Sequence, residues 1–114
     1  MRFAIGETQF TSRNTAQTLE AAPFIESGRT MVPLRAIAEG LDAAAILGWN
    51  DGVVYISRGG ADFTLAVGVA LPDGMGTPVV VAGRVFVPAR YVSEIFGATI
   101  RWENSTREVF IYEE

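Results

Sequence analysis

Apolar side chains along this chain follow two spacings, which predict different elements. One spacing, of three or four residues, puts four of them on a single face of a helix: Leu34, Ile37, Ala38 and Leu41. Pro33 stands just before that face, and proline is favoured at the first position of a helix because its missing N–H leaves no donor unpaired there. Between residues 46 and 57 apolar and polar residues alternate around Asp51-Gly52, which is typical of a β-hairpin with a type I′ turn. This segment is therefore predicted to be a short helix followed by two paired strands.

A second segment of the chain repeats the first. Residues 28–35 read GRTMVPLR and residues 83–90 read GRVFVPAR, an offset of 55 positions. Six positions are identical across the helix and the strand before it: Gly28, Arg29, Val32, Pro33, Arg35 and Glu39 match Gly83, Arg84, Val87, Pro88, Arg90 and Glu94. Trp49 and Trp102 then follow, out of step by two residues, and each is expected to close a strand. We therefore predict internal repeats over about residues 20–57 and 78–112, preceded by an N-terminal strand and loop over residues 1–19.

Each repeat is predicted to have the element order β-β-β-α-β-β. The Thr-rich stretch 8–22 is expected to be a loop or an edge hairpin, and residues 71–76 are expected to be a loop. Half of 114 residues would bury too little apolar surface to be stable alone. We therefore predict one α+β domain over residues 1–114, in which the duplicated units are related by a pseudo-two-fold axis and antiparallel sheets pack on two short helices.

The composition narrows the chemistry that this chain can perform. It has nine arginines but no lysine, histidine or cysteine, which excludes disulfides, thiol nucleophiles, imidazole acid–base catalysis and Cys/His metal sites. The net charge is −4 and the arginines are scattered, whereas a nucleic-acid binder needs a clustered basic face. No apolar run is long enough to span a bilayer. We expect no enzymatic activity, no cofactor, no bound metal, no nucleic-acid partner and no membrane insertion.

The repeated motif resembles a known family. Residues 23–39 read PFIESGRTMVPLRAIAE and precede a strand that ends in Trp49, and a similar pattern begins at Pro78. This pattern resembles the copper amine oxidase N-terminal-like domain over about residues 20–112. Its motif residues fall here on two equivalent sets: Gly28, Arg29, Pro33, Arg35, Glu39 and Trp49, and then Gly83, Arg84, Pro88, Arg90, Glu94 and Trp102.

The resemblance implies a non-catalytic stalk module of exported, cell-wall-attached proteins of Gram-positive bacteria, located outside the cell. Its implied partners are other domains of the same surface protein or a cell-wall polymer. The family name does not imply copper binding. Residues 1–5 lack the features of a signal peptide and are expected to form a strand.

Several aromatic residues recur in the strands and allow two interpretations. They could form a stacking platform for the sugar rings of a cell-wall glycan: Trp49, Tyr55, Trp102, Phe110 and Tyr112. Alternatively, they lie in the core, because aromatic side chains dominate the burial in small domains. The matching positions of the two tryptophans favour the second interpretation, so we expect both indole rings to be mostly buried.

The charged residues of the two predicted helices also allow alternatives. Arg35 and Arg90 could hold an anion, but we expect them to brace the junction between elements, since a guanidinium donates several hydrogen bonds at once. Glu39 and Glu94 stand four residues after these arginines, where salt bridges are favoured over a carboxylate pair for hydrolysis. The sequence therefore predicts a structural or binding module that acts as stalk, spacer or contact. The alternative is an accessory or pro-domain that positions or masks a neighbouring hydrolase or protease.

Overall fold

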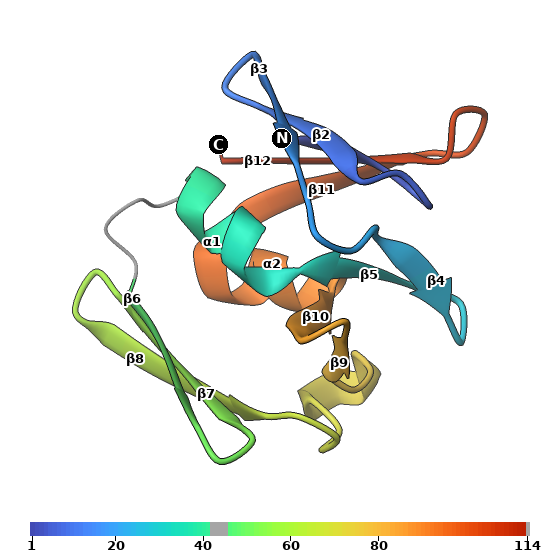
Figure 1. The fold of residues 1–114 in the computed structure, drawn as a ribbon. Coiled ribbons are helices and arrows are strands. Elements are labelled where there is room, and N and C mark those ends of the chain that lie inside the picture. Colours follow the sequence, from blue (N-terminus) through green and yellow to red (C-terminus); the bar gives the residue numbers. More distant parts are fainter. Residues whose placement is uncertain (42–45, 114) are drawn as a thin grey trace.

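Three antiparallel sheets surround two short helices in the computed structural model of this chain (Figure 1). The structure describes residues 1–41 and 46–113. Residues 42–45, which fall within the first predicted repeat, and residue 114 lie outside the described residues. The mixture of antiparallel strands and two eight-residue helices confirms the predicted α+β class.

The central sheet joins the two halves of the chain. Its order is β4-β5-β10-β9, with β4 (Phe24–Glu26), β5 (Arg29–Pro33), β10 (Arg84–Pro88) and β9 (Val79–Val81). At its middle, Val32 faces Val87, and these are equivalent residues of the two octets. On either side Met31 faces Pro88 and Pro33 faces Phe86. Met31 is equivalent to Phe86 and Pro33 to Pro88, so exchanging the two halves turns one of these pairs into the other. A pseudo-two-fold axis therefore passes between β5 and β10.

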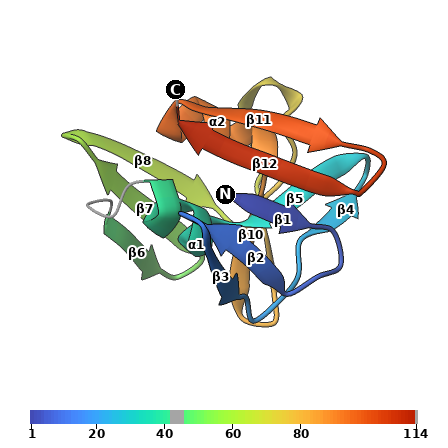
Figure 2. The ribbon, with the colours of Figure 1, turned by 90° about the horizontal axis from the view of Figure 1, so that it is seen from above.

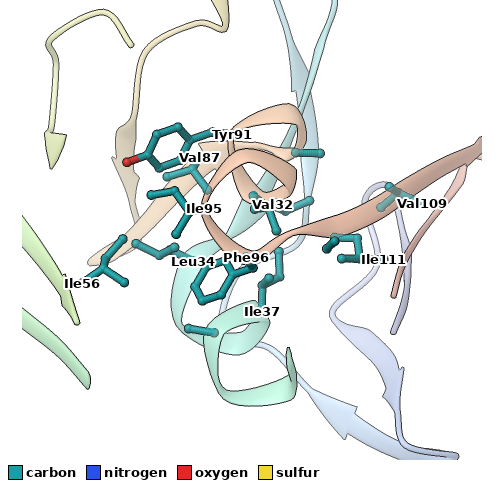
Figure 3. Packing of buried hydrophobic residues seen from close by; sticks show 14 of the residues in the cluster. Val32, Leu34, Ile37, Ile56, Val87, Tyr91, Ile95, Phe96, Val109 and Ile111 are labelled. Carbon is teal, nitrogen blue, oxygen red and sulfur yellow. The ribbon is translucent and has the colours of Figure 1, made fainter. Parts of the chain in front are cut away.

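The two helices follow directly from the two central strands. They are α1 (Leu34–Leu41) and α2 (Ala89–Phe96), and each begins one residue after the proline that was expected to open it. Pro33 and Pro88 instead end β5 and β10, since their fixed φ also suits an extended strand end. The apolar helix faces pack against each other and against the sheets in one core (Figure 3). Ile37 and Val92, at equivalent positions, are fully buried.

Each outer sheet contains the last two strands of one repeat and the first strand of the other. One sheet is β6 (Ile46–Asn50), β7 (Val53–Arg58) and β8 (Ala61–Ala66). The other has the order β11-β12-β1-β2-β3, with β11 (Ala98–Glu103), β12 (Glu108–Glu113), β1 (Arg2–Ala4), β2 (Gln9–Ser12) and β3 (Thr15–Thr18). The first strands thus link the halves a second time (Figure 2).

The hydrogen bonds of the first strands repeat with the same symmetry. Ile5 donates its N–H to the Arg107 carbonyl at 3.0 Å, and Val67 donates to the Gly52 carbonyl at 2.9 Å. The N–H groups of Gly6 and Gly68 donate to two other equivalent carbonyls, those of Pro23 and Pro78. Equivalent residues in and just after the first strands β1 and β8, such as Ile5 and Val67, are 62 positions apart, whereas equivalent residues of the octets are 55 positions apart. The difference arises because the first half contains extra residues, which form the hairpin β2–β3. The stretch 8–22 is therefore an edge hairpin, while residues 71–76 include a 3-10 turn, Pro72–Gly74.

Two-residue turns of the type I′ kind connect several of the hairpins, whereas the four residues 104–107 connect β11 to β12. Asp51 and Gly52 have φ values of 51° and 84°, as the sequence predicts for this turn. The glycine that opens each octet is the second residue of such a turn, after Ser27 in one copy and after Ala82 in the other. Ala82 has φ of 52°, a left-handed conformation that is unfavourable for a residue with a Cβ.

Candidate functional site

An open groove of about 830 Å³ lies beside α1, where the hairpin β2–β3, strand β6 and the β9–β10 hairpin approach one another. Its walls are largely apolar and come from all of these elements: Leu19, Leu34, Leu47, Trp49, Val80 and Val85. Leu19 and Leu34 are buried, whereas the Trp49 side chain is 57% exposed. The groove therefore has a buried apolar floor and an accessible indole at its wall, which are features of ligand sites.

Charged side chains surround this apolar floor. Arg13, Arg35 and Arg84 line the groove together with Glu20 and Glu39. Arg84 forms an ion pair with Glu20, and Arg13 donates a hydrogen bond to the Gly40 carbonyl at 3.5 Å. The groove thus contains three cationic side chains and two carboxylates, and one of each forms the ion pair. Such a groove can recognise a ligand that has both apolar and anionic parts.

A smaller hollow of about 460 Å³ is related to the groove by the internal repeat. Apart from Ser27, every residue that lines it corresponds, at an offset of 55, to a residue that lines the groove: Gly28, Arg29, Thr30, Gly74, Met75, Pro88, Ala89 and Arg90. In both places the Gly-Arg start of one octet meets the Pro-x-Arg end of the other. The repeated octet therefore builds two equivalent hollows, a role that its sequence alone did not reveal.

Arg29 braces the smaller hollow. Its Nη2 donates to the Gly74 carbonyl at 2.8 Å and its Nη1 to the Ser27 carbonyl at 3.4 Å. Gly76 lies so close that an added Cβ would stand 2.6 Å from Arg29 Cδ. The neighbouring Met75 is 5% exposed, so the loop before β9 packs closely at this hollow.

Arg35 and Arg90 are exposed, which corrects the expectation that their side chains point away from solvent. Both are exposed residues, and so are Glu39 and Glu94, because the helix faces that carry them turn away from the core. A contact between the two halves is made by Arg29, the other arginine of the first octet. No feature of the sequence distinguishes Arg29 for such a contact, since all four arginines are equally repeated.

Trp49 is not mostly buried, which corrects a second expectation, whereas Trp102 has a smaller exposed fraction. Trp49 is 57% and Trp102 is 38% exposed. Each faces a buried valine of its partner strand, Val54 or Val109, so each stands on the inner side of its sheet. However, each precedes a turn at the end of its hairpin, where the cover from the core ends.

The five aromatic residues do not form one platform. Trp49 lines the groove, while Tyr55 stands on the opposite side of the same sheet, since side chains of adjacent strand positions alternate and Tyr55 faces Gly48. Only Phe110 and Tyr112 share a face, two residues apart on β12. A glycan platform that uses all five side chains is therefore not assembled.

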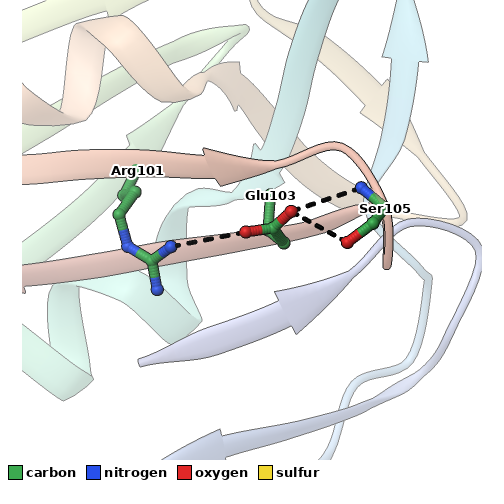
Figure 4. A network of polar contacts seen from close by, with 3 residues as sticks. All are labelled: Arg101, Glu103 and Ser105. Atoms are coloured by element: carbon green, nitrogen blue, oxygen red, sulfur yellow. Dashed lines mark hydrogen bonds and ion pairs between the residues drawn. The ribbon is translucent and has the colours of Figure 1, made fainter.

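The face of β12 that carries Phe110 has its own polar contacts. The Arg101 guanidinium lies 4.2 Å from the centre of the Phe110 ring and 3.8 Å from a Glu103 carboxylate oxygen. Glu103 also accepts from the Ser105 hydroxyl at 2.8 Å and from its N–H at 3.4 Å (Figure 4). The Ser105 side-chain and backbone hydrogen bonds, with a smaller contribution from Arg101, lower the pKa of Glu103 below its ordinary value.

Residues 10–111 match the family described as the copper amine oxidase N-terminal domain. The chain belongs to that family. Comparisons with curated proteins and with solved structures found no match. In amine oxidases the copper amine oxidase N-terminal domain is non-catalytic, which is consistent with a structural module.

The residues of this family member do not fit the copper of the family name. Copper sites in proteins use histidine and cysteine ligands, and the chain has neither. Among the described residues, no three His, Cys, Asp or Glu side chains gather closely enough to hold a metal ion. Within the same residues, no helix has the length and apolar character needed to cross a membrane.

Proposed function

We propose that this copper amine oxidase N-terminal domain is a non-catalytic contact module of an exported, cell-wall-associated bacterial protein. The motif shared by the two repeats and the family membership support a structural role over an enzymatic one. Family members of the stalk type, which the sequence resembles, support a location outside the cell. The observation that separates a contact from a simple spacer is the placement of the two ends of the domain.

Both ends of the domain lie side by side on adjacent strands (Figure 1). The Met1 amino group donates to the Ile111 carbonyl at 2.7 Å, and the Ile111 N–H donates to the Met1 carbonyl at 2.9 Å. Any polypeptide joined to both ends would enter and leave at one place. Such a domain projects sideways from the chain and adds little to its length, which favours a contact role over that of a spacer.

The proposed location can be tested in the organism that encodes the protein. An antibody against the purified module is applied to intact and to permeabilised cells, and the wall fraction is blotted. We expect equal labelling of both kinds of cell and a signal in the wall fraction, with a cytosolic enzyme labelled only after permeabilisation as the control. Labelling that appears only after permeabilisation would refute export.

Deletion of the module distinguishes a contact role from the alternative role as an accessory domain of a neighbouring enzyme. A contact module lost from its protein should reduce retention in the wall fraction while the activity of the neighbouring domains stays unchanged. If deletion instead alters the rate of a neighbouring hydrolase or protease without changing its location, the domain masks or positions that enzyme.

A further inference from the structure

The groove beside α1 is bordered by an outermost strand from each of the three sheets. β3, β6 and β9 each stand at the edge of their sheet, and each contributes side chains to the groove. An edge strand presents backbone N–H and C=O groups that no neighbouring strand pairs. The groove therefore combines an apolar floor with backbone groups that can pair with an added strand.

The pairing of β6 with β7 shows which of its backbone groups point toward the free edge. Asn50 and Val53 flank the two-residue turn, and such a pair exchanges hydrogen bonds in a type I′ hairpin. The pairs alternate along the ladder, so the N–H and C=O of Leu47 and Trp49 point away from β7. Within residues 1–41 and 46–113, no backbone hydrogen bond joins these groups to another segment.

The side chains of the same two residues line the groove. Leu47 and Trp49 face the buried Ile56 and Val54 across the hairpin and lie on the groove side of the sheet. Gly48, between them, has no side chain to obstruct a neighbouring strand. A polypeptide paired with this edge would thus place alternate side chains on the apolar floor, beside the exposed indole.

The charges around the floor favour acidic side chains in that polypeptide. The groove is lined by three arginines, Arg13, Arg35 and Arg84, against two carboxylates, so its net charge is positive. Arg84 is paired with Glu20, which leaves Arg13 and the exposed Arg35 as the cations for an anionic ligand. Carboxylates beside guanidinium groups form strong charge-assisted hydrogen bonds. Apolar side chains at the centre and acidic ones toward the ends would match both the floor and its surroundings.

We propose that the groove binds an extended segment of another protein, which pairs as an additional strand with the free edge of β6. Its groove-facing apolar side chains contact Leu34, Leu47 and Trp49, and its acidic side chains meet the arginines. Main-chain hydrogen bonds supply affinity in this kind of recognition, and alternate side chains supply specificity. The proposal goes beyond the proposed function and does not depend on export, so either can fail without the other.

A designed peptide tests the proposal directly. Fluorescein-labelled Glu-Thr-Val-Thr-Val-Thr-Glu has valine and glutamate on one face and reads the same from either end, so its side chains match the groove in either strand orientation. We expect its fluorescence anisotropy to rise saturably when the purified module is added. The peptide with lysine in place of both glutamates should bind about tenfold more weakly, a difference of about 1.4 kcal/mol.

N-methylation of the peptide separates strand pairing from simple apolar contact. In antiparallel pairing the two valine amides point their donors toward β6, so methyl groups on both should abolish binding. A methyl group on the central threonine amide, which would point away from β6, is the matched control and should leave binding within about twofold. Equal binding of both methylated peptides would overturn strand addition.

Matched variants of the protein locate the site. Leu47→Pro removes an edge-facing N–H, which edge strands tolerate, and should weaken peptide binding at least about tenfold. Ile100→Pro is the control. Ile100 faces Ile111, whose N–H and C=O are bonded to Met1 and therefore point away from β11. The Ile100 N–H accordingly points away from β12, to the free edge of β11. Ile100 does not line the groove. The control variant should bind as the parent does.

Two results would overturn the proposal. One is equal loss of binding in both proline variants while both retain the parent's circular dichroism. The other is that the peptide does not bind and that a uronic-acid oligosaccharide binds saturably instead. If Leu47→Pro leaves this oligosaccharide binding unchanged and Trp49→Ala abolishes it, the groove is a glycan site. Should Leu47→Pro fail to fold, the methylated peptides still decide the question with the parent protein.

Discussion

Replacing Arg29 and Arg84 by alanine should have unequal effects, although the two residues are equivalent in the repeat. Arg29 is partly exposed and donates to the Gly74 carbonyl at 2.8 Å across the two halves. A hydrogen bond from a charged donor contributes about 1.5–3 kcal/mol, and partial exposure places Arg29 near the lower limit. Arg84 and Glu20 form an ion pair with exposed side chains, and such pairs contribute at most about 1 kcal/mol.

Urea denaturation followed by circular dichroism measures both variants, at low salt and in about 1 M NaCl, where the Debye length is about 3 Å. We expect Arg29→Ala to lower the free energy of unfolding by about 1.5 kcal/mol at either salt concentration. The smaller cost of Arg84→Ala should largely vanish at high salt. Arg35→Ala is the surface control and should stay within about 0.5 kcal/mol of the parent. Equal costs for Arg29→Ala and Arg84→Ala, both abolished by salt, would refute the assignment of the brace to Arg29.

Three further predictions follow from single residues. Ala82→Asn should raise the free energy of unfolding by about 0.5–1 kcal/mol, because asparagine tolerates the left-handed φ of 52° in this turn; a loss of stability in urea would contradict the turn geometry. Acrylamide should quench the fluorescence of both Trp49→Phe and Trp102→Phe, since the remaining indole is exposed in each, and a protected indole in either variant would show burial instead. Ser105→Ala should raise the pKa of Glu103 toward its ordinary value in an NMR titration. With Ser105 present, the contribution of Glu103 to stability should exist above the unfolded-state pKa and be lost as the pH falls through the lower folded-state pKa; an unchanged pKa would remove Ser105 as the cause.

Local features of the sequence predicted the elements of this fold well. Asp51-Gly52 forms the expected type I′ turn, because this dipeptide accepts two positive φ angles. The apolar spacing from Leu34 onward forms one helix face, and its equivalent in the second half forms another. These predictions held because turn and helix preferences depend on neighbouring residues. The hairpin β2–β3 remained one of two alternatives, since the polar residues of 8–22 carry no alternating apolar pattern.

Longer-range features could not be obtained in the same way. The exposure of Trp49 depends on where the helices end relative to a hairpin, and no spacing in the sequence encodes that distance. The choice between Arg29 and Arg35 as the brace depends on which carbonyl lies within reach, and Gly74 is 45 positions away from Arg29. The groove itself was missed because its walls come from elements that are distant in the sequence. An unexplained repeated dipeptide, Gly-Arg, was the one available signal for the hollows.

The pseudo-two-fold arrangement explains why the same octet can produce two equivalent hollows of different size. Gly76 lets the loop before β9 approach Arg29, and Met75 is buried there. The equivalent of Met75 is the exposed Glu20, which lines the groove and pairs there with Arg84. Strand β11 begins two residues after α2 ends, whereas β6 begins at Ile46, five residues after the end of α1. The repeated octets thus fix the frame of both hollows, and the residues between the repeated elements determine that the one beside α1 is the larger.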